Sequence, residues 1–150
     1  MKVLEIRKFA DVDREIVLDM MRRFYNSPAV LTNGSEKIFA VNFDACIKDS
    51  AFVEGYVFVV DEKIIGYGML VKSFSTEFGG ECIWIEDIFI EENFRGKGIG
   101  TQFMNFIKEN YPDKILRLET ETDNLKAVNL YNKCGFKKLP YLEMIFTKGD

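Results

Sequence analysis

Apolar residues are grouped along the chain in two kinds of segment, and the two kinds alternate. Short runs rich in apolar residues predict six strands, at residues 3–8, 56–60, 64–74, 82–90, 115–120 and 141–146. Apolar residues at helical spacing predict four helices, of which two lie at residues 35–48 and 125–133. The first helix of the chain is capped by Asp11, and its apolar residues are Val12, Ile16, Val17, Met20, Met21 and Phe24. The third ends before Pro112 and carries one apolar stripe, made of Ile99, Phe103, Phe106 and Ile107. The alternation predicts a three-layer α/β domain with a mixed sheet.

Local signals refine this picture. Residues 82–90 are apolar at both strand parities, which predicts a central strand covered on both faces. Asp61-Glu62-Lys63 lies between two predicted strands and predicts a hairpin. Gly66 and Gly68 share one face of the second strand, where we expect another group to approach closely. Gly135 fits a left-handed cap after the last helix.

Length and composition fit one ordered domain. The chain has 150 residues, no repeat and no linker-like tract, so we expect a single domain over residues 1–150. Its 47% hydrophobic content, with 14 Phe, excludes a disordered chain. Its net charge of −4 disfavours nucleic-acid binding.

Missing residue types exclude several chemistries. The chain has no His, which excludes Ser-His-Asp and Cys-His nucleophile systems and His-ligated metals. Cys46, Cys82 and Cys134 lie far apart, so we expect no disulfide framework, no metal site and a reducing compartment. No stretch resembles a signal peptide or a membrane span. We therefore expect a soluble, cytoplasmic protein.

A glycine-rich turn, Arg95-Gly96-Lys97-Gly98-Ile99-Gly100, joins a predicted strand to a predicted helix. Unpaired N–H groups and the dipole at a helix start attract anions, and glycines let a ligand come close to the backbone. Arg95 and Lys97 add positive charge for phosphate oxygens. No P-loop string exists. The dinucleotide fingerprint fails because Thr101 stands where Gly or Ala belongs, although Glu119 lies near the spacing of a ribose-binding acid.

Three motifs in this region occur in the order found in one family. The turn matches Arg/Gln-x-x-Gly-x-Gly/Ala, and Ile85-Glu86-Asp87-Ile88-Phe89-Ile90 is similar to the strand before it. Downstream, Asn-x-x-Ala-x-x-Leu-Tyr-x-x-x-Gly-Phe is matched by Asn124, Ala127, Leu130, Tyr131, Gly135 and Phe136. Over residues 83–136 the chain thus resembles the GNAT superfamily of N-acetyltransferases, while its N-terminal third resembles it only in element order.

The resemblance implies a fold and a cofactor. The fold is a three-layer one, with a central mixed, mostly antiparallel sheet, helices on both faces, and fourth and fifth strands that splay apart. The acetyl donor that the resemblance implies is acetyl-coenzyme A. Its pyrophosphate would rest on the turn made of Arg95, Gly96, Lys97, Gly98, Ile99, Gly100 and Thr101. Its pantetheine would pair with the backbone at Ile88, Phe89 and Ile90. Asn124 and Asn129 match positions that touch the cofactor, although Asn124 is equally a helix cap.

Glu86 and Asp87 are adjacent carboxylates in an otherwise apolar strand. Burial and a like-charged neighbour both raise a carboxyl pKa, which suits a general base. Regular alternation sends them to opposite faces, and a bulge of the kind the family has there re-aims one. We predict that Glu86 is the base, directly or through water, and that Asp87 attracts a cationic substrate. The alternative is a strand end with two solvated acids.

Two tyrosines complete the predicted site. Tyr131 matches the family's general acid, which protonates the coenzyme A sulfur; otherwise a tyrosine on this apolar stripe is a core residue. Tyr25 begins a segment that lines the acceptor pocket in the family, or else an ordinary helix–helix loop.

We expect direct acetyl transfer to a primary amine of a small molecule, a peptide or a protein. The alternative is a non-catalytic acyl-coenzyme A sensor, and a homodimer is the default assembly.

Overall fold

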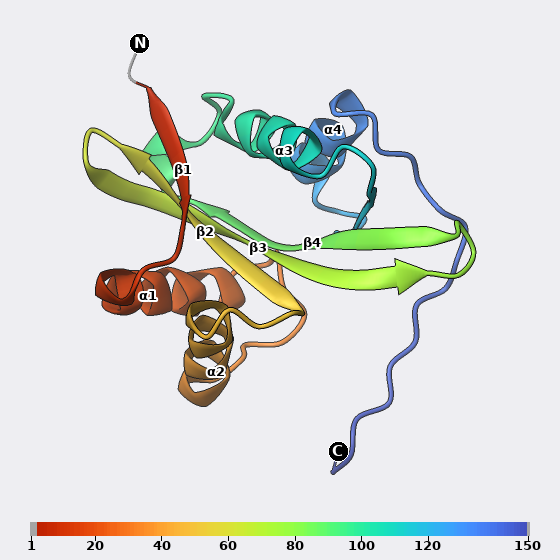
Figure 1. Cartoon of the computed structure of the whole chain (residues 1–150), viewed down its shortest axis with the longest axis horizontal. Helices are drawn as coiled ribbons and strands as arrows, with labels where there is room; N and C mark the ends of the chain where they lie inside the picture. The colour runs from red at the N-terminus through yellow and green to blue at the C-terminus, as the bar shows by residue number, and fades with distance from the viewer. Residues whose placement is uncertain (1–2, 150) are drawn as a thin grey trace.

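The computed structural model describes residues 3–149 and places a five-stranded sheet between two layers of helices (Figure 1). The strands lie across the sheet in chain order, as β1 (Leu4–Lys8), β2 (Val53–Val60), β3 (Lys63–Ser75), β4 (Gly80–Ile90) and β5 (Ile115–Leu118). All neighbours are antiparallel except β4 and β5, which are parallel. The expected mixed, mostly antiparallel sheet with helices on both faces is confirmed.

Each face of the sheet has its own core. On one face lie α1 (Arg14–Tyr25) and α2 (Glu36–Ile47), and on the other lie α3 (Ile99–Asn110) and α4 (Leu125–Lys133) (Figure 1). The first core gathers Phe9, Val17, Met20, Met21, Phe39, Phe43, Val57, Val59, Tyr67, Met69 and Phe89. The second gathers Tyr56, Phe58, Val60, Ile65, Leu70, Ile83, Ile85, Ile99, Phe103, Met104 and Ile107.

Local sequence explains most helix bounds. The Ser35 hydroxyl accepts a hydrogen bond from the Ile38 N–H at 3.2 Å and caps α2, as expected. The prediction for α1 is wrong at its start, because residues Asp11–Asp13 form a separate 3₁₀ turn, η1. The Asp13 carboxylate accepts hydrogen bonds from Arg7 at 2.8 and 3.0 Å instead of capping the helix. Val12 consequently leaves the apolar stripe and is 90% exposed.

The β2–β3 hairpin confirms the expected close approach at its glycines. Asp61 and Glu62 form its turn with φ of 50° and 63°, the left-handed region that tight hairpin turns require. A Cβ added at Gly68 would lie 2.5 Å from the Phe103 ring of α3. The missing side chain therefore lets α3 pack directly on the sheet, which fixes the position of its N-terminal turn.

The expected last strand is not formed. Residues 141–146 run as an extended chain outside the sheet, and β5 is the edge strand of the described molecule. A strand needs a ladder of hydrogen bonds with a neighbouring strand, and an apolar pattern alone does not provide that neighbour. Among residues 3–149 no helix has the length and apolar character needed to cross a membrane.

Candidate active site

A β-bulge at Glu86 divides β4 into two parts with opposite side-chain parity. Met69 of β3 lies opposite Asp87 and Leu70 lies opposite Ile85, so Glu86 is the extra residue in the ladder. Ile85 packs in the core beneath α3, whereas Asp87 points toward α1. Regular alternation would have put these two side chains on the same face. The bulge lets Glu86 reach solvent while Asp87 is buried.

Asp87 is a buried carboxylate held by two tyrosines. It is 4% exposed and accepts hydrogen bonds from the Tyr25 hydroxyl at 3.1 Å and the Tyr67 hydroxyl at 2.9 Å. Burial raises the pKa of Asp87 to about 6, against the two tyrosine hydrogen bonds, which favour the charged form. Tyr25 therefore joins the site through Asp87. The predicted attraction of a cation by Asp87 would act through its charge across the bulge rather than by solvent-exposed contact.

Glu86 belongs to a group of three carboxyls. Partial desolvation, with a smaller contribution from the Glu143 charge, raises the pKa of Glu86. Glu119 follows β5. Burial, and after it a hydrogen bond with Glu143, raise the pKa of Glu119 to about 7. In the sequence, Glu119 stood out only as the ribose-binding acid of a dinucleotide fold that we rejected. Nothing in the sequence pointed to Glu143. Their proximity depends on the path of the chain after α4, for which no sequence motif provides a signal.

The glycine turn before α3 leaves open space beside its backbone. Gly96 and Gly98 have φ of 73° and 83°, and Gly98 is the N-cap of α3. A Cβ at either position would meet no atom of the described chain within 4 Å. The glycines are thus needed for backbone conformation, and the space beside them is open. Gly100 differs, because its Cβ would lie 2.9 Å from the Leu130 side chain and would separate α3 from α4.

The two basic side chains of the turn contact neighbouring residues: Arg95 contacts the end of β4, and Lys97 contacts Phe94 just before the turn. Arg95 Nε donates a hydrogen bond to the Ile90 carbonyl at 2.7 Å, and the Arg95 guanidinium lies 5.7 Å from the centre of the Phe89 ring. Lys97 Nζ lies 5.5 Å from the centre of the Phe94 ring. Both residues are exposed beside Gly96 and Gly98. Arg95 therefore also anchors the turn to the end of β4.

The splay of β4 and β5 leaves half of β4 without a neighbour on one side. Pairing joins Cys82–Ile85 to Ile115–Leu118 and stops there, although β4 continues to Ile90. Within residues 3–149, the backbone edge at Ile88, Phe89 and Ile90 therefore has no strand partner on the side of β5. The Ile90 carbonyl accepts the Arg95 hydrogen bond, and the other backbone groups that face this side would be open to an extended amide-bearing ligand. The expected splay is confirmed.

Helix α4 packs on the same core as the unpaired end of β4. Tyr131 is half-buried in the same core cluster as Ile88 and Ile90, and burial raises the pKa of its hydroxyl. Asn124 caps α4 by accepting a hydrogen bond from the Ala127 N–H at 3.3 Å, so its capping role is confirmed. Asn129 is exposed. The contacts of Asn124 and Asn129 with a cofactor stay a prediction.

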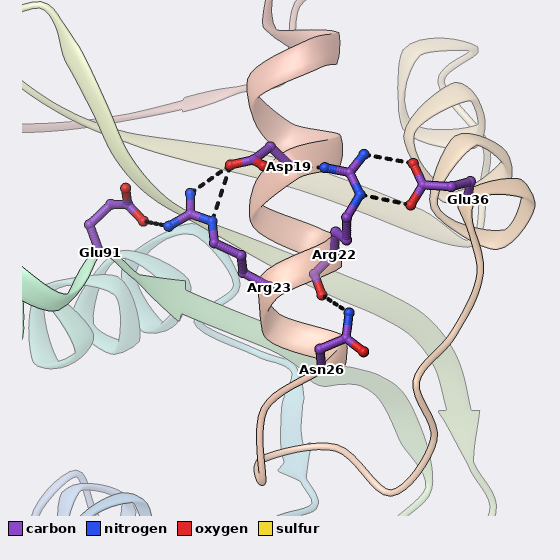
Figure 2. Close-up of polar contacts among 6 residues, drawn as sticks. All are labelled: Asp19, Arg22, Arg23, Asn26, Glu36 and Glu91. Atoms are coloured by element: carbon purple, nitrogen blue, oxygen red, sulfur yellow. Dashed lines mark hydrogen bonds and ion pairs between the residues drawn. The ribbon is translucent and has the colours of Figure 1, made fainter.

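Ion pairs join the C-terminal half of α1 to α2 and to the residue that follows β4 (Figure 2). Arg22 pairs with Glu36 of α2 through two bonds of 2.9 and 2.6 Å. Arg23 pairs with Asp19 on α1 and with Glu91, the residue that follows β4. The C-terminal end of α1 is thereby joined to the end of β4 on which the site is built.

Comparisons with known proteins agree with this geometry. Residues 18–136 match the model of the Acetyltransferase (GNAT) family. A thialysine N-epsilon-acetyltransferase of Bos taurus is 35% identical over 83 residues, which are 53% of this chain and 48% of that protein. A streptothricin acetyltransferase of Escherichia coli is 33% identical over 99 residues, 64% of this chain and 52% of that protein. The chain thus spans about half the length of the curated relatives it matches.

Solved structures share the fold over nearly the whole chain. Aminoglycoside N-acetyltransferase AAC(6')-Iy, solved with CoA, has a TM-score of 0.81 at 11% identity and covers 99% of this chain and 97% of its own. A predicted acetyltransferase of Clostridium acetobutylicum, solved with acetyl-CoA, has a TM-score of 0.74 at 17% identity, covering 95% and 96%. The family match, the glycine turn and the splayed strands together show that the chain belongs to the acetyltransferase (GNAT) family.

Proposed function

We propose that this protein is an acetyl-coenzyme A-dependent N-acetyltransferase that modifies a primary amine of a small molecule, a peptide or a protein. The observation that carries the proposal is the open, glycine-rich turn at Gly96 and Gly98, which follows a half of β4 that lacks a neighbouring strand. The matched relatives named for thialysine and streptothricin acetylation favour a small-molecule amine.

The residues of the glycine turn suit the cofactor. The backbone from Gly96 to Thr101 and the Arg95 and Lys97 side chains would hold a pyrophosphate, and Asn124 and Asn129 would approach the cofactor from α4. The free edge of β4 at Ile88, Phe89 and Ile90 would pair with the pantetheine amides, and an N–H near Ile88 would stabilise the developing oxyanion. Acetyl-coenzyme A, when bound, supplies an activated acetyl thioester with a thiolate leaving group.

Two side chains would move the protons. An alkyl ammonium has a pKa of about 10.4, so near neutral pH Glu86 must accept a proton before the amine nitrogen can attack. When the nitrogen–carbon bond forms and the carbon–sulfur bond breaks, the Tyr131 hydroxyl would donate a proton to the sulfur, and the further proton that the nitrogen loses as it becomes an amide would restore the Tyr131 hydroxyl. The raised pKa of Tyr131 keeps this hydroxyl protonated until then. Asp87, with a pKa of about 6, is largely ionised at neutral pH and favours a cationic amine.

Thiol release with a panel of amines, followed by mass spectrometry of the products, tests this function. We expect one thiol released for each acetyl group added to an amine, and no acetyl group on Cys134 during turnover. Tight coenzyme A binding with thiol release no faster than background for every amine would instead favour the acyl-coenzyme A sensor.

We also propose that residues 1–150 act as one domain in the cytoplasm. Cys46, Cys82 and Cys134 are free thiols, which supports a reducing compartment. Expression of the tagged protein followed by cell fractionation tests the location.

A further inference from the structure

Trp84, the one tryptophan of the chain, lies outside both cores. It stands in β4 between Ile83 and Ile85, which both pack in the second core. Alternation along the strand therefore puts the Trp84 ring on the opposite face of the sheet, the face that carries α1 and α2. The ring is only half-buried there. A large aromatic side chain that is partly open on a sheet face is typical of a surface that binds a ligand.

The Arg117 side chain of β5 lies over this ring. Arg117 is the register partner of Trp84, and its guanidinium carbon is 4.6 Å from the centre of the Trp84 ring. Leu116 and Leu118 on either side pack against the second core, so Arg117 shares the face of Trp84. Arg117 is half-buried, and within residues 3–149 its guanidinium makes no hydrogen bond and no ion pair. Its five N–H donors are therefore open to a ligand.

The carboxyls near Arg117 are bonded to other groups. Glu119 feels the Arg117 charge but is hydrogen-bonded with Glu143, and the carboxylate of Glu77 accepts the hydrogen bond of the Tyr141 hydroxyl. A partly desolvated guanidinium without a counterion is unfavourable, and a ring contact offsets only part of that cost. Carboxylate and phosphate both match the fork of N–H groups that a guanidinium presents. The acidic surroundings favour the singly charged carboxylate, because they repel a doubly charged phosphate more strongly.

Arg117 lies close to the place where the two strands part. The pairing of β4 with β5 ends at Ile85 and Leu118, one residue beyond Trp84 and Arg117. Glu86 follows Ile85, so along β4 it lies two residues, or about 7 Å, from the level of Trp84. An extended chain of about five carbon atoms between a nitrogen and a carboxyl carbon spans a similar distance. One small molecule can therefore reach from Glu86 to Arg117.

We propose that Arg117, supported by the Trp84 ring, binds a carboxylate of the acceptor, so that the preferred acceptors are amines with a carboxylate about five carbons from the nitrogen. This inference rests on the proposed function, because it places the reacting amine at Glu86. The two ends of such an acceptor are oppositely charged, as are Glu86 and Arg117. A polyamine would instead leave the guanidinium without a counterion and bring a second positive charge toward it.

A matched pair of acceptors measures the preference. 6-Aminohexanoate and 6-aminohexanamide have the same amine and the same length and differ in the charge of the far end. We expect kcat/KM of the wild type to be about tenfold or more higher for the acid, mainly through KM, and the ratio to fall to about one in Arg117→Gln. Lys114→Gln is the control, because Lys114 precedes β5 and pairs with Glu81; it should keep the preference. Equal kcat/KM values in the wild type, or a preference that survives in Arg117→Gln, would overturn the proposal.

The fluorescence of Trp84 reports binding without acetyl transfer, since the chain has no other tryptophan. The full chain is titrated with 6-aminohexanoate, first alone and then with coenzyme A present, and circular dichroism checks that each variant is folded. We expect a saturable change in emission with the wild type and a Kd about tenfold higher with Arg117→Gln. No saturable change, or the same Kd in both proteins, would rule out the carboxylate site. Saturable binding without thiol release for any amine would contradict the proposed activity alone, whereas thiol release without a preference for the acid would contradict the carboxylate site alone.

Discussion

At the scale of single residues, one inserted residue gives two neighbouring acids opposite surroundings. The bulge leaves Glu86 accessible to a substrate and sends Asp87 into the first core, where two tyrosine hydroxyls hold it. A carboxylate that must take a proton from a substrate needs access, whereas one that supplies a fixed charge needs a rigid position. Regular strand geometry would also have put the two carboxylates on opposite faces. The bulge determines which of them is exposed and which is buried, and so separates their two proposed roles.

Replacing Glu86 by Gln tests its role as base. We expect kcat for an alkylamine to fall by about a hundredfold, a typical contribution of a general base. The loss should grow as pH is lowered toward the pKa of Glu86, because the variant depends on amine that is already neutral, and that fraction falls about tenfold per pH unit. The pH profile of kcat measures this effect. Glu81→Gln, at an exposed position of the same strand, is the control; an unchanged profile in Glu86→Gln would assign the proton to another base.

Replacing Tyr131 by Phe tests its role as acid. We expect kcat to fall by about a hundredfold while the affinity for acetyl-coenzyme A stays nearly constant, because the lost hydroxyl acts on the departing sulfur. Stopped-flow turnover and calorimetric binding give the two quantities. Tyr111→Phe removes another half-buried hydroxyl, one that bonds to Glu54, and should keep its kcat. A wild-type rate in Tyr131→Phe would leave this residue as core packing alone.

The raised pKa of Asp87 predicts how stability depends on pH. An unfolded Asp has a pKa of about 3.9, whereas folded Asp87 titrates at about 6. Between these values the folded chain keeps a proton that the unfolded chain has lost, so this carboxyl makes stability fall as pH rises from about 4 to about 6. Relative to Asp87→Asn, the wild-type free energy of unfolding should drop by up to roughly 3 kcal/mol over that window.

Urea denaturation at a series of pH values measures this difference. Asp113→Asn is the control, because Asp113 is exposed in the segment before β5 and should run parallel to the wild type. A constant difference between Asp87→Asn and the wild type from pH about 4 to about 7 would show that burial does not raise this carboxyl's pKa.

At the scale of elements, the turn before α3 and the turn between β3 and β4 make a matched pair. Gly98 and Gly79 both have left-handed φ, 83° and 68°, and a Cβ at either would meet no described atom within 4 Å. Substitution by Ala should therefore cost each variant about 1–2 kcal/mol of backbone strain. Only Gly98→Ala places a methyl group in the proposed pyrophosphate site. We expect it alone to lose coenzyme A affinity, by about tenfold in calorimetry; equal affinities in both variants would remove the turn from the binding site.

Elements were predictable from sequence where local signals determined them. The Ser35 cap and the periodicity of α4 gave helix limits within one residue, because capping and amphipathicity are properties of neighbouring residues. The start of α1 was missed because Asp11, the predicted cap, begins the 3₁₀ turn η1, and the helix starts only at Arg14. The proximity of Glu119 and Glu143 was missed because it depends on chain path. The last strand was predicted from apolar pattern, but a strand also requires a partner.

At the scale of the whole molecule, the two cores hold the open half of β4 between rigid layers. Arg22 and Arg23 join α1 to α2 and to the end of β4 (Figure 2). The absence of a side chain at Gly68 lets α3 pack closely on the sheet. The opening between β4 and β5 is therefore part of a preorganised frame, and ligand binding should stabilise it without a large rearrangement.

A thermal-stability comparison tests this on the intact protein. Coenzyme A at about a hundredfold excess over its Kd should add about 2.7 kcal/mol to the free energy of unfolding, whereas NAD at the same concentration should add nothing measurable. Hydrogen exchange should then show the new protection at residues 88–90 and 96–101, on the two sides of the opening, while the β2–β3 turn at Asp61 and Glu62 exchanges as before. Equal stabilisation by NAD, or protection that is spread evenly over both cores, would contradict a site built from the glycine turn and the free edge of β4.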